Sequence, residues 1–75
     1  MTFRRVDIQV YGVSSRASEL ERFLRGFPCV FYASVDPATE TAYIEYDDQP
    51  TDLEEILEGA AQRGFRMGRP LVFVA

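Results

Sequence analysis

The feature of this sequence that most constrains its fold is the order in which two hydrophobic periodicities alternate. Apolar residues recur at every second position, as in β-strands, over residues 3–11 and 41–46, and short runs rich in apolar residues over 30–35 and 71–74 predict two further strands. They recur at every third or fourth position, as in helices, over residues 16–26 and 51–63. The order strand–helix–strand–strand–helix–strand predicts an α+β sandwich in which a four-stranded antiparallel sheet carries both helices on one face.

Polar residues and glycines mark the expected ends of both helices. Ser14 or Ser15 is expected to cap the first helix, because a serine hydroxyl accepts hydrogen bonds from the first free amides. Thr51 and Glu54 have the spacing of a capping box at the start of the second helix. Gly64 is expected to close that helix. The sequence therefore predicts compact elements with no linker, in a single domain over residues 1–75.

Composition limits the functions that such a chain can perform. The chain contains no histidine and one cysteine, Cys29, so no internal disulfide and no histidine base or ligand is available. The net charge of −4 disfavours binding of nucleic acid, and no apolar run approaches the roughly 20 residues of a membrane span. We therefore expect a cytoplasmic protein that is not an enzyme, has no cofactor, and binds neither nucleic acid nor membranes.

Six short segments follow one another along the chain, at residues 12–14, 27–30, 34–39, 43–47, 53–56 and 61–65. In their order and spacing they resemble the heavy-metal-associated domains of copper chaperones and metal-pumping ATPases. The resemblance covers nearly the whole chain. It implies a ferredoxin-like βαββαβ sandwich and, in the family, a metal site in the loop after the first strand.

That loop is where this chain departs from the family. The family carries Gly-Met-x-Cys-x-x-Cys, whose two thiolates hold a soft metal ion. Here the segment reads Gly-Val-Ser-Ser-Arg-Ala-Ser, so the degenerate metal loop contains Ser14, Ser15, Arg16 and Ser18 in place of the thiolates. Cys29 follows the first helix, at the opposite end of the implied fold, and cannot replace the missing pair. Metal binding in the family's manner is not expected.

Four arginines form a candidate patch for an anion or an acidic partner. The amides at the start of the first helix, together with Arg16, can hold a carboxylate or phosphate. Arg63, Arg66 and Arg69 follow the second helix and are expected at the same end of the domain. The alternative is that the serines only cap the helix and that the arginines are solvated or pair locally.

Tyrosines mark a candidate interaction face. By alternation Tyr11, Tyr32 and Tyr43 project away from the helices, where they can form a contiguous band on the sheet. Tyrosine suits surfaces that are wet in one state and buried in another, although aromatic cover of a small sheet is the alternative. Residues 42–46 loosely match the aromatic motif of RNA-recognition domains, but Thr39 and Thr41 flank Glu40 where that motif has a basic residue and glycine.

Two functions of different class remain open. The first is a non-enzymatic interaction module that has lost canonical metal binding and that binds a protein partner or itself. The alternative is a metal-binding or transport protein with unusual ligands, which include Cys29 shared across a dimer, Met67 or carboxylates.

Overall fold

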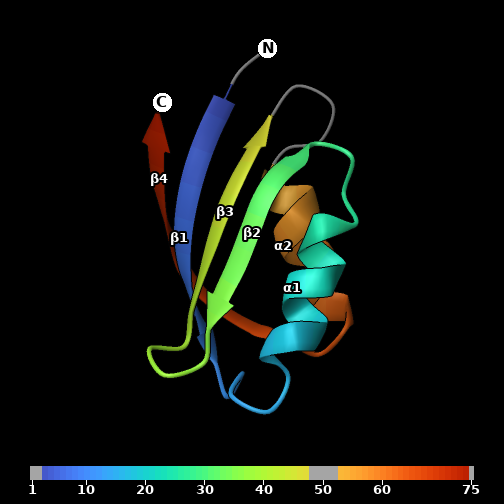
Figure 1. Cartoon of the computed structure of the whole chain (residues 1–75), viewed down its shortest axis with the longest axis vertical. Coiled ribbons are helices and arrows are strands. Elements are labelled where there is room, and N and C mark those ends of the chain that lie inside the picture. Colours follow the sequence, from blue (N-terminus) through green and yellow to red (C-terminus); the bar gives the residue numbers. More distant parts are fainter. Residues whose placement is uncertain (1–2, 48–52, 75) are drawn as a thin grey trace.

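The order of elements predicted from the sequence is confirmed. The computed structural model describes residues 3–47 and 53–74. The elements are β1 (Phe3–Tyr11), α1 (Ala17–Arg25), β2 (Val30–Asp36), β3 (Thr41–Asp47), α2 (Leu53–Gln62) and β4 (Arg66–Val74). Figure 1 shows them in sequence colours.

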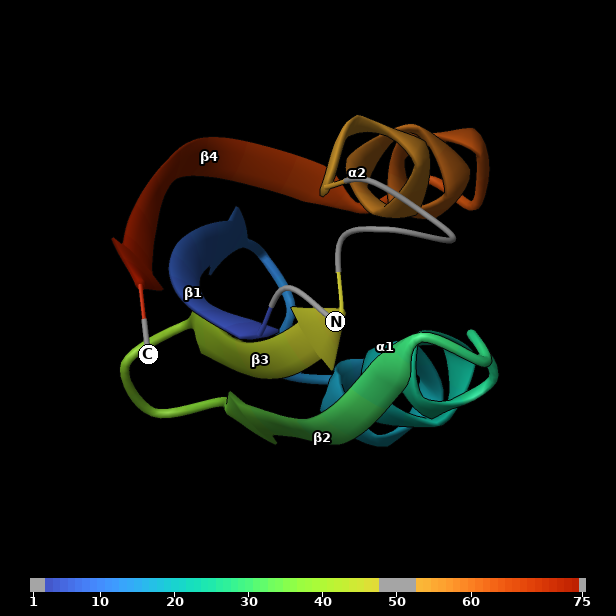
Figure 2. The ribbon, with the colours of Figure 1, turned by 90° about the horizontal axis from the view of Figure 1, so that it is seen from above.

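The strands form one antiparallel sheet in the order β2-β3-β1-β4. Both helices cover the same face of this sheet, as the view from above in Figure 2 shows. The opposite face carries neither helix, and we call it the open face. This arrangement confirms the predicted α+β, ferredoxin-like sandwich.

The core lies between the sheet and the two helices. The inward residues of β1 and β3 alternate with outward ones, so Val6, Ile8 and Ile44 are fully buried. From the helices, Leu20, Leu24, Ile56 and Ala60 close the core from the other side. Burial of these apolar side chains supplies the main favourable free energy of folding.

The expected serine cap of α1 is wrong. Arg16 occupies the N-cap position and makes no side-chain cap hydrogen bond, while its amide donates to the Val13 carbonyl at 2.7 Å. A tight turn through the loop therefore leads into α1, and it leaves Ser14 and Ser15 exposed. The capping box predicted at Thr51 lies outside the described residues.

The last strand is longer than the sequence predicted, because it begins at Arg66 and not at residue 71. A register shift between Ile8 and Val10 lets β4 continue past Pro70 and pair Met67 with Val10. Gly68 makes this approach possible, since a Cβ there would lie 3.3 Å from the Gln9 carbonyl oxygen. Neither described helix is long and apolar enough to cross a membrane.

Candidate functional site

The loop after β1 is held in place by the turn between β2 and β3. The Glu40 carboxylate accepts a hydrogen bond from the Gly12 amide at 2.6 Å, and the Glu40 carbonyl accepts one from Val10 at 2.7 Å. Gly12 and Glu40 both have positive φ, 68° and 52°. These bonds join two loops at the same end of the sheet and fix the shape of the loop after β1.

Arg16 ties this loop to the end of α2. Its Nη2 donates to Glu19 Oε2 at 2.6 Å and to the Arg63 carbonyl at 3.0 Å. Its guanidinium lies 4.1 Å from the centre of the Phe65 ring, a cation–π contact. The cation that this loop holds is therefore a side chain of the protein itself.

The ion pair changes the acid–base properties of both partners. Hydrogen bonds from Arg16 hold the pKa of Glu19 below its ordinary value, and Glu19 raises the pKa of Arg16. A lowered carboxylate pKa stabilises the fold above the pKa of the unfolded state, and this contribution is lost as pH falls through the lowered folded value. The contact with Arg16 is thus present at neutral pH.

The residues of this loop do not fit a soft metal ion. Serine hydroxyls are poor ligands for such ions, and the Arg16 guanidinium repels a cation. Cys29 is 3% exposed, and its carbonyl accepts a bond from Asp47 near the other end of the sheet. Met67 pairs with Val10, far along the strands from Cys29. Within residues 3–47 and 53–74, no group of three cysteine, aspartate or glutamate side chains is placed to hold a metal ion.

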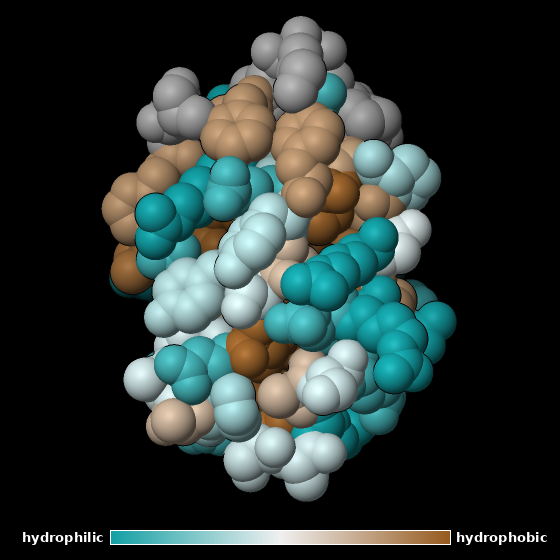
Figure 3. Space-filling view, viewed as in Figure 1, coloured by the Kyte–Doolittle hydropathy of each residue, from teal (hydrophilic) through white to brown (hydrophobic). Residues whose placement is uncertain are grey.

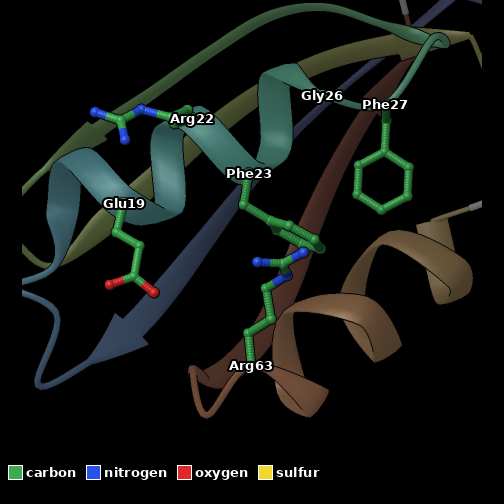
Figure 4. A pocket seen from close by; sticks show the side chains of 6 residues that line it. All are labelled: Glu19, Arg22, Phe23, Gly26, Phe27 and Arg63. Atoms are coloured by element: carbon green, nitrogen blue, oxygen red, sulfur yellow. The ribbon is translucent and has the colours of Figure 1, made fainter.

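A pocket of about 500 Å³ lies between the two helices. Phe23 and Phe27 pack edge to face at 5.2 Å and form its apolar floor. The Arg63 guanidinium lies over the Phe23 ring at 4.5 Å, whereas Arg22 points away from both rings in Figure 4. The Arg63 guanidinium, in contact with the Phe23 ring, therefore covers part of this pocket.

The four arginines of the predicted patch do not gather in one place. Arg16 and Arg63 meet on the side of the helices. Arg66 is paired with Tyr11 in the sheet, and it shares the open face with Tyr11 because paired residues project to the same side. Arg69 lines a hollow on that face with Tyr11 and Thr41. The predicted patch is therefore two separate pairs on opposite faces.

The tyrosines are also divided. Tyr32 is paired with Glu45, and Tyr43 precedes Glu45 by two residues on β3. The two tyrosines are therefore diagonal neighbours on the open face. Tyr11 lies at the other end of β1, opposite Arg66. The contiguous band expected from alternation is thus limited to Tyr32 and Tyr43.

Exposed aromatic residues that sequence reasoning missed lie across the open face, at the end where β1 begins. The Phe3 and Phe31 rings stack with centroids 5.8 Å apart, and Arg5 lies 5.5 Å from the centre of the Phe73 ring. We call Phe3, Phe31, Tyr32 and Phe73 the aromatic end of the open face. In Figure 3 hydrophobic side chains gather in the upper half of the molecule, towards the end where β1 begins.

A bulge in β2 creates this aromatic end. Val30 pairs with Tyr46, but Tyr32 pairs with Glu45, so two steps on β2 match one step on β3. Strict alternation from Ala33 would turn Phe31 towards the helices. The bulge instead leaves Phe31 51% exposed and Tyr32 47% exposed as neighbours. Phe3 and Phe73 could have been found from alternation alone, whereas Phe31 could not.

The fold that these elements form is that of heavy-metal-associated domains. One solved structure with this fold is oxidised MerP from Ralstonia metallidurans CH34, with 19% identity, a TM-score of 0.80 and coverage of 88% of this chain and 94% of that one. Another is the Cu(I)-loaded N-terminal domain of a potential copper-translocating P-type ATPase from Bacillus subtilis, with 23% identity, a TM-score of 0.79 and coverage of 89% and 85%.

A third is the yeast copper transporter domain CCC2A, with 21% identity, a TM-score of 0.75 and coverage of 85% and 90%. No protein-family model and no curated protein matches this chain. At these identities the likenesses establish the fold alone.

Proposed function

We propose that this chain is a non-enzymatic protein-binding domain, built on the scaffold of the copper and mercury domains. The aromatic end of the open face supports this most strongly. Phe31, Tyr32 and Phe73 are 51%, 47% and 49% exposed, and Leu71, which shares β4 with Phe73, is 58% exposed. Large exposed apolar side chains gathered on one face mark sites where proteins bind, and tyrosine and phenylalanine are enriched at such sites.

The degenerate loop supports the same proposal. Arg16 donates hydrogen bonds to the Arg63 carbonyl and to the Glu19 carboxylate, and its guanidinium packs on the Phe65 ring. A cationic side chain therefore already occupies this end of the domain. Binding through the sheet leaves this end unchanged. With no histidine and a buried cysteine, the chain lacks the usual pair of nucleophile and base. Binding, and not catalysis, is the activity that its exposed groups favour.

Immobilised protein is expected to retain a protein partner through the aromatic end. The bait is presented both to an extract of its source cells and to untagged copies of itself. The double variant Phe31→Ser/Phe73→Ser should retain at least tenfold less, because truncating aromatic residues that anchor an interface typically costs roughly 2 kcal/mol or more. Bound protein is measured by quantitative mass spectrometry.

Arg22→Ala is the matched control, since Arg22 is exposed on α1, and α1 covers the face of the sheet opposite to the open face (Figure 2). It should retain as much as the wild type. Equal retention by the wild type and the double variant contradicts the proposed function. Circular dichroism of each variant checks that the fold is intact.

Metal binding through unusual ligands is the second candidate. The structural neighbours, which include Cu(I)-loaded domains, favour it more than they favour a protein-binding domain. The side chains available as metal ligands argue against metal binding, because the one thiol, Cys29, is buried and the loop after β1 contains Arg16. The two candidates differ in whether a metal binds tightly in stoichiometric amount.

A titration of reduced protein with Cu(I), Zn(II) and Cd(II), read by native mass spectrometry, separates the two candidates. We expect no stoichiometric complex to survive a weak competing chelator. The Cys29→Ser variant is the control: a complex that disappears in this variant places the metal at Cys29. A tight complex in the wild type supports the second candidate and contradicts our reading of the Arg16 loop.

A further inference from the structure

We propose that the partner of the open face is a second copy of this chain, packed face to face about a two-fold axis that runs parallel to the strands between β1 and β3. The proposal rests on the proposed function, because it names the partner that the aromatic end binds. It is carried by the way in which charged and aromatic residues are ordered across the sheet.

Two rows of side chains cross the open face near its aromatic end. The register of the strands places Tyr32, Glu45, Arg5 and Phe73 side by side in the first row, from β2 to β4. The second row, one step along, contains Ser34, Tyr43, Asp7 and Leu71. Each row thus has one residue from every strand, and the first has an aromatic residue at both ends with an acid and a base between them.

This order is complementary to itself. A two-fold axis along the strands exchanges β1 with β3 and β4 with β2, so each residue faces the residue at the mirrored place in the row. Glu45 then faces Arg5 of the second copy, and Tyr32 faces Phe73 of the second copy. Acid meets base and ring meets ring, and each contact occurs twice.

The second row follows the same rule. Tyr43 faces Asp7 of the second copy, where its hydroxyl can donate a hydrogen bond to the carboxylate. Leu71 faces Ser34 at the rim. Packed sheets cross at about 30°, so the match is closest for the residues beside the axis, which are Arg5 and Glu45. These two charges therefore decide the register of the two copies.

The exposed apolar area suits a weak dimer. Phe31, Tyr32, Leu71 and Phe73 are each about half exposed. Side chains of this size present roughly 100 Å² each in that state, which gives about 800 Å² for two copies. The polar and charged side chains between and around them bring the total towards the roughly 1,200 Å² at the lower limit of specific interfaces. A dissociation constant in the micromolar range is expected.

The edges of the sheet are less suited to pairing than its face. Glu21 and Arg25 of α1 bond to the backbone of β2, through the Val35 amide at 3.2 Å and the Ala33 carbonyl at 3.1 Å. On the other edge Pro70 lies within β4 and has no amide to donate to an added strand. Association by strand addition is therefore hindered on both sides, and the open face remains.

Charge reversal tests this geometry by analytical ultracentrifugation over a range of protein concentrations. Arg5→Glu or Glu45→Arg alone places like charges opposite each other twice per dimer and should raise the dissociation constant at least tenfold. The double variant Arg5→Glu/Glu45→Arg restores opposite charges and should bring the constant back to within about threefold of the wild type. Arg22→Glu on α1 should leave it unchanged.

Arg5 also pairs with Asp7 at 3.2 Å within its own chain, so the melting temperature of each variant is measured alongside. Phe73→Ser changes an exposed position and should weaken the dimer without unfolding the chain. A wild type that sediments as a monomer up to about 1 mM overturns the proposal. So does a dimer that neither single reversal weakens. Retention of a different protein by the immobilised wild type would then leave the proposed function standing while the dimer fails.

Discussion

Replacing Ile8 with alanine is expected to lower the free energy of unfolding by about 3 kcal/mol. Ile8 is fully buried on the central strand β1, between Ala42 of β3 and Pro70 of β4. The substitution leaves a cavity that the sheet cannot close, because strands on both sides hold the backbone. A domain of this size has roughly 4–11 kcal/mol of stability in total, so the loss is large.

Urea unfolding followed by circular dichroism measures this effect. Gln9→Ala is the matched control, since Gln9 is the next residue on the same strand but is exposed. It should change the free energy of unfolding by less than about 0.5 kcal/mol. Equal losses at the two positions would contradict the core described above.

Replacing Gly64 with valine is expected to cost about 2–3 kcal/mol. Gly64 has a φ of 88°, which side chains with a branched Cβ rarely adopt. It ends α2 in a Schellman motif, in which its amide donates to the Ala61 carbonyl at 2.9 Å and the Phe65 amide donates to Ala60 at 3.1 Å. Strain at this residue disturbs both bonds and the position of Phe65 beneath Arg16.

The Gly64→Asn variant also adds a side chain at this position, so it separates the effect of backbone strain from the effect of added side-chain volume. Asparagine tolerates positive φ, so it should cost about 1 kcal/mol or less in the same urea measurement. A valine variant as stable as the asparagine variant would show that the positive φ is not required at this position.

Local patterns in the sequence predict most of the fold. Alternation in Val6, Ile8 and Val10 predicted the bounds of β1 correctly, because apolar residues of a strand occupy the buried face and polar residues the exposed face. The errors fall where the chain depends on distant partners. The segment from Arg66 to Arg69 pairs with β1 only because Gly68 and a register shift allow it, and no local pattern reveals that pairing.

The candidate site was less predictable from sequence. The absence of a thiolate pair in the loop was evident in the residues themselves, and so was the charge of Arg16. The contacts of Arg16 with Phe65 and with the Arg63 carbonyl join residues 47 or more positions apart, so only the folded chain brings them together. The arginine patch failed for the same reason, since nearness in sequence does not decide which face a residue occupies.

The sequence by itself determined the order of the elements, the buried set of β1 and β3, and the chemistry available to the loop. These follow from residue type and from periodicity, which act within a few residues. Only the tertiary structure decided the aromatic end, the split of the arginines and tyrosines, and the self-complementary rows on the open face. Those depend on strand register and on one bulge between Val30 and Tyr32, and register is set by the packing of the whole sheet.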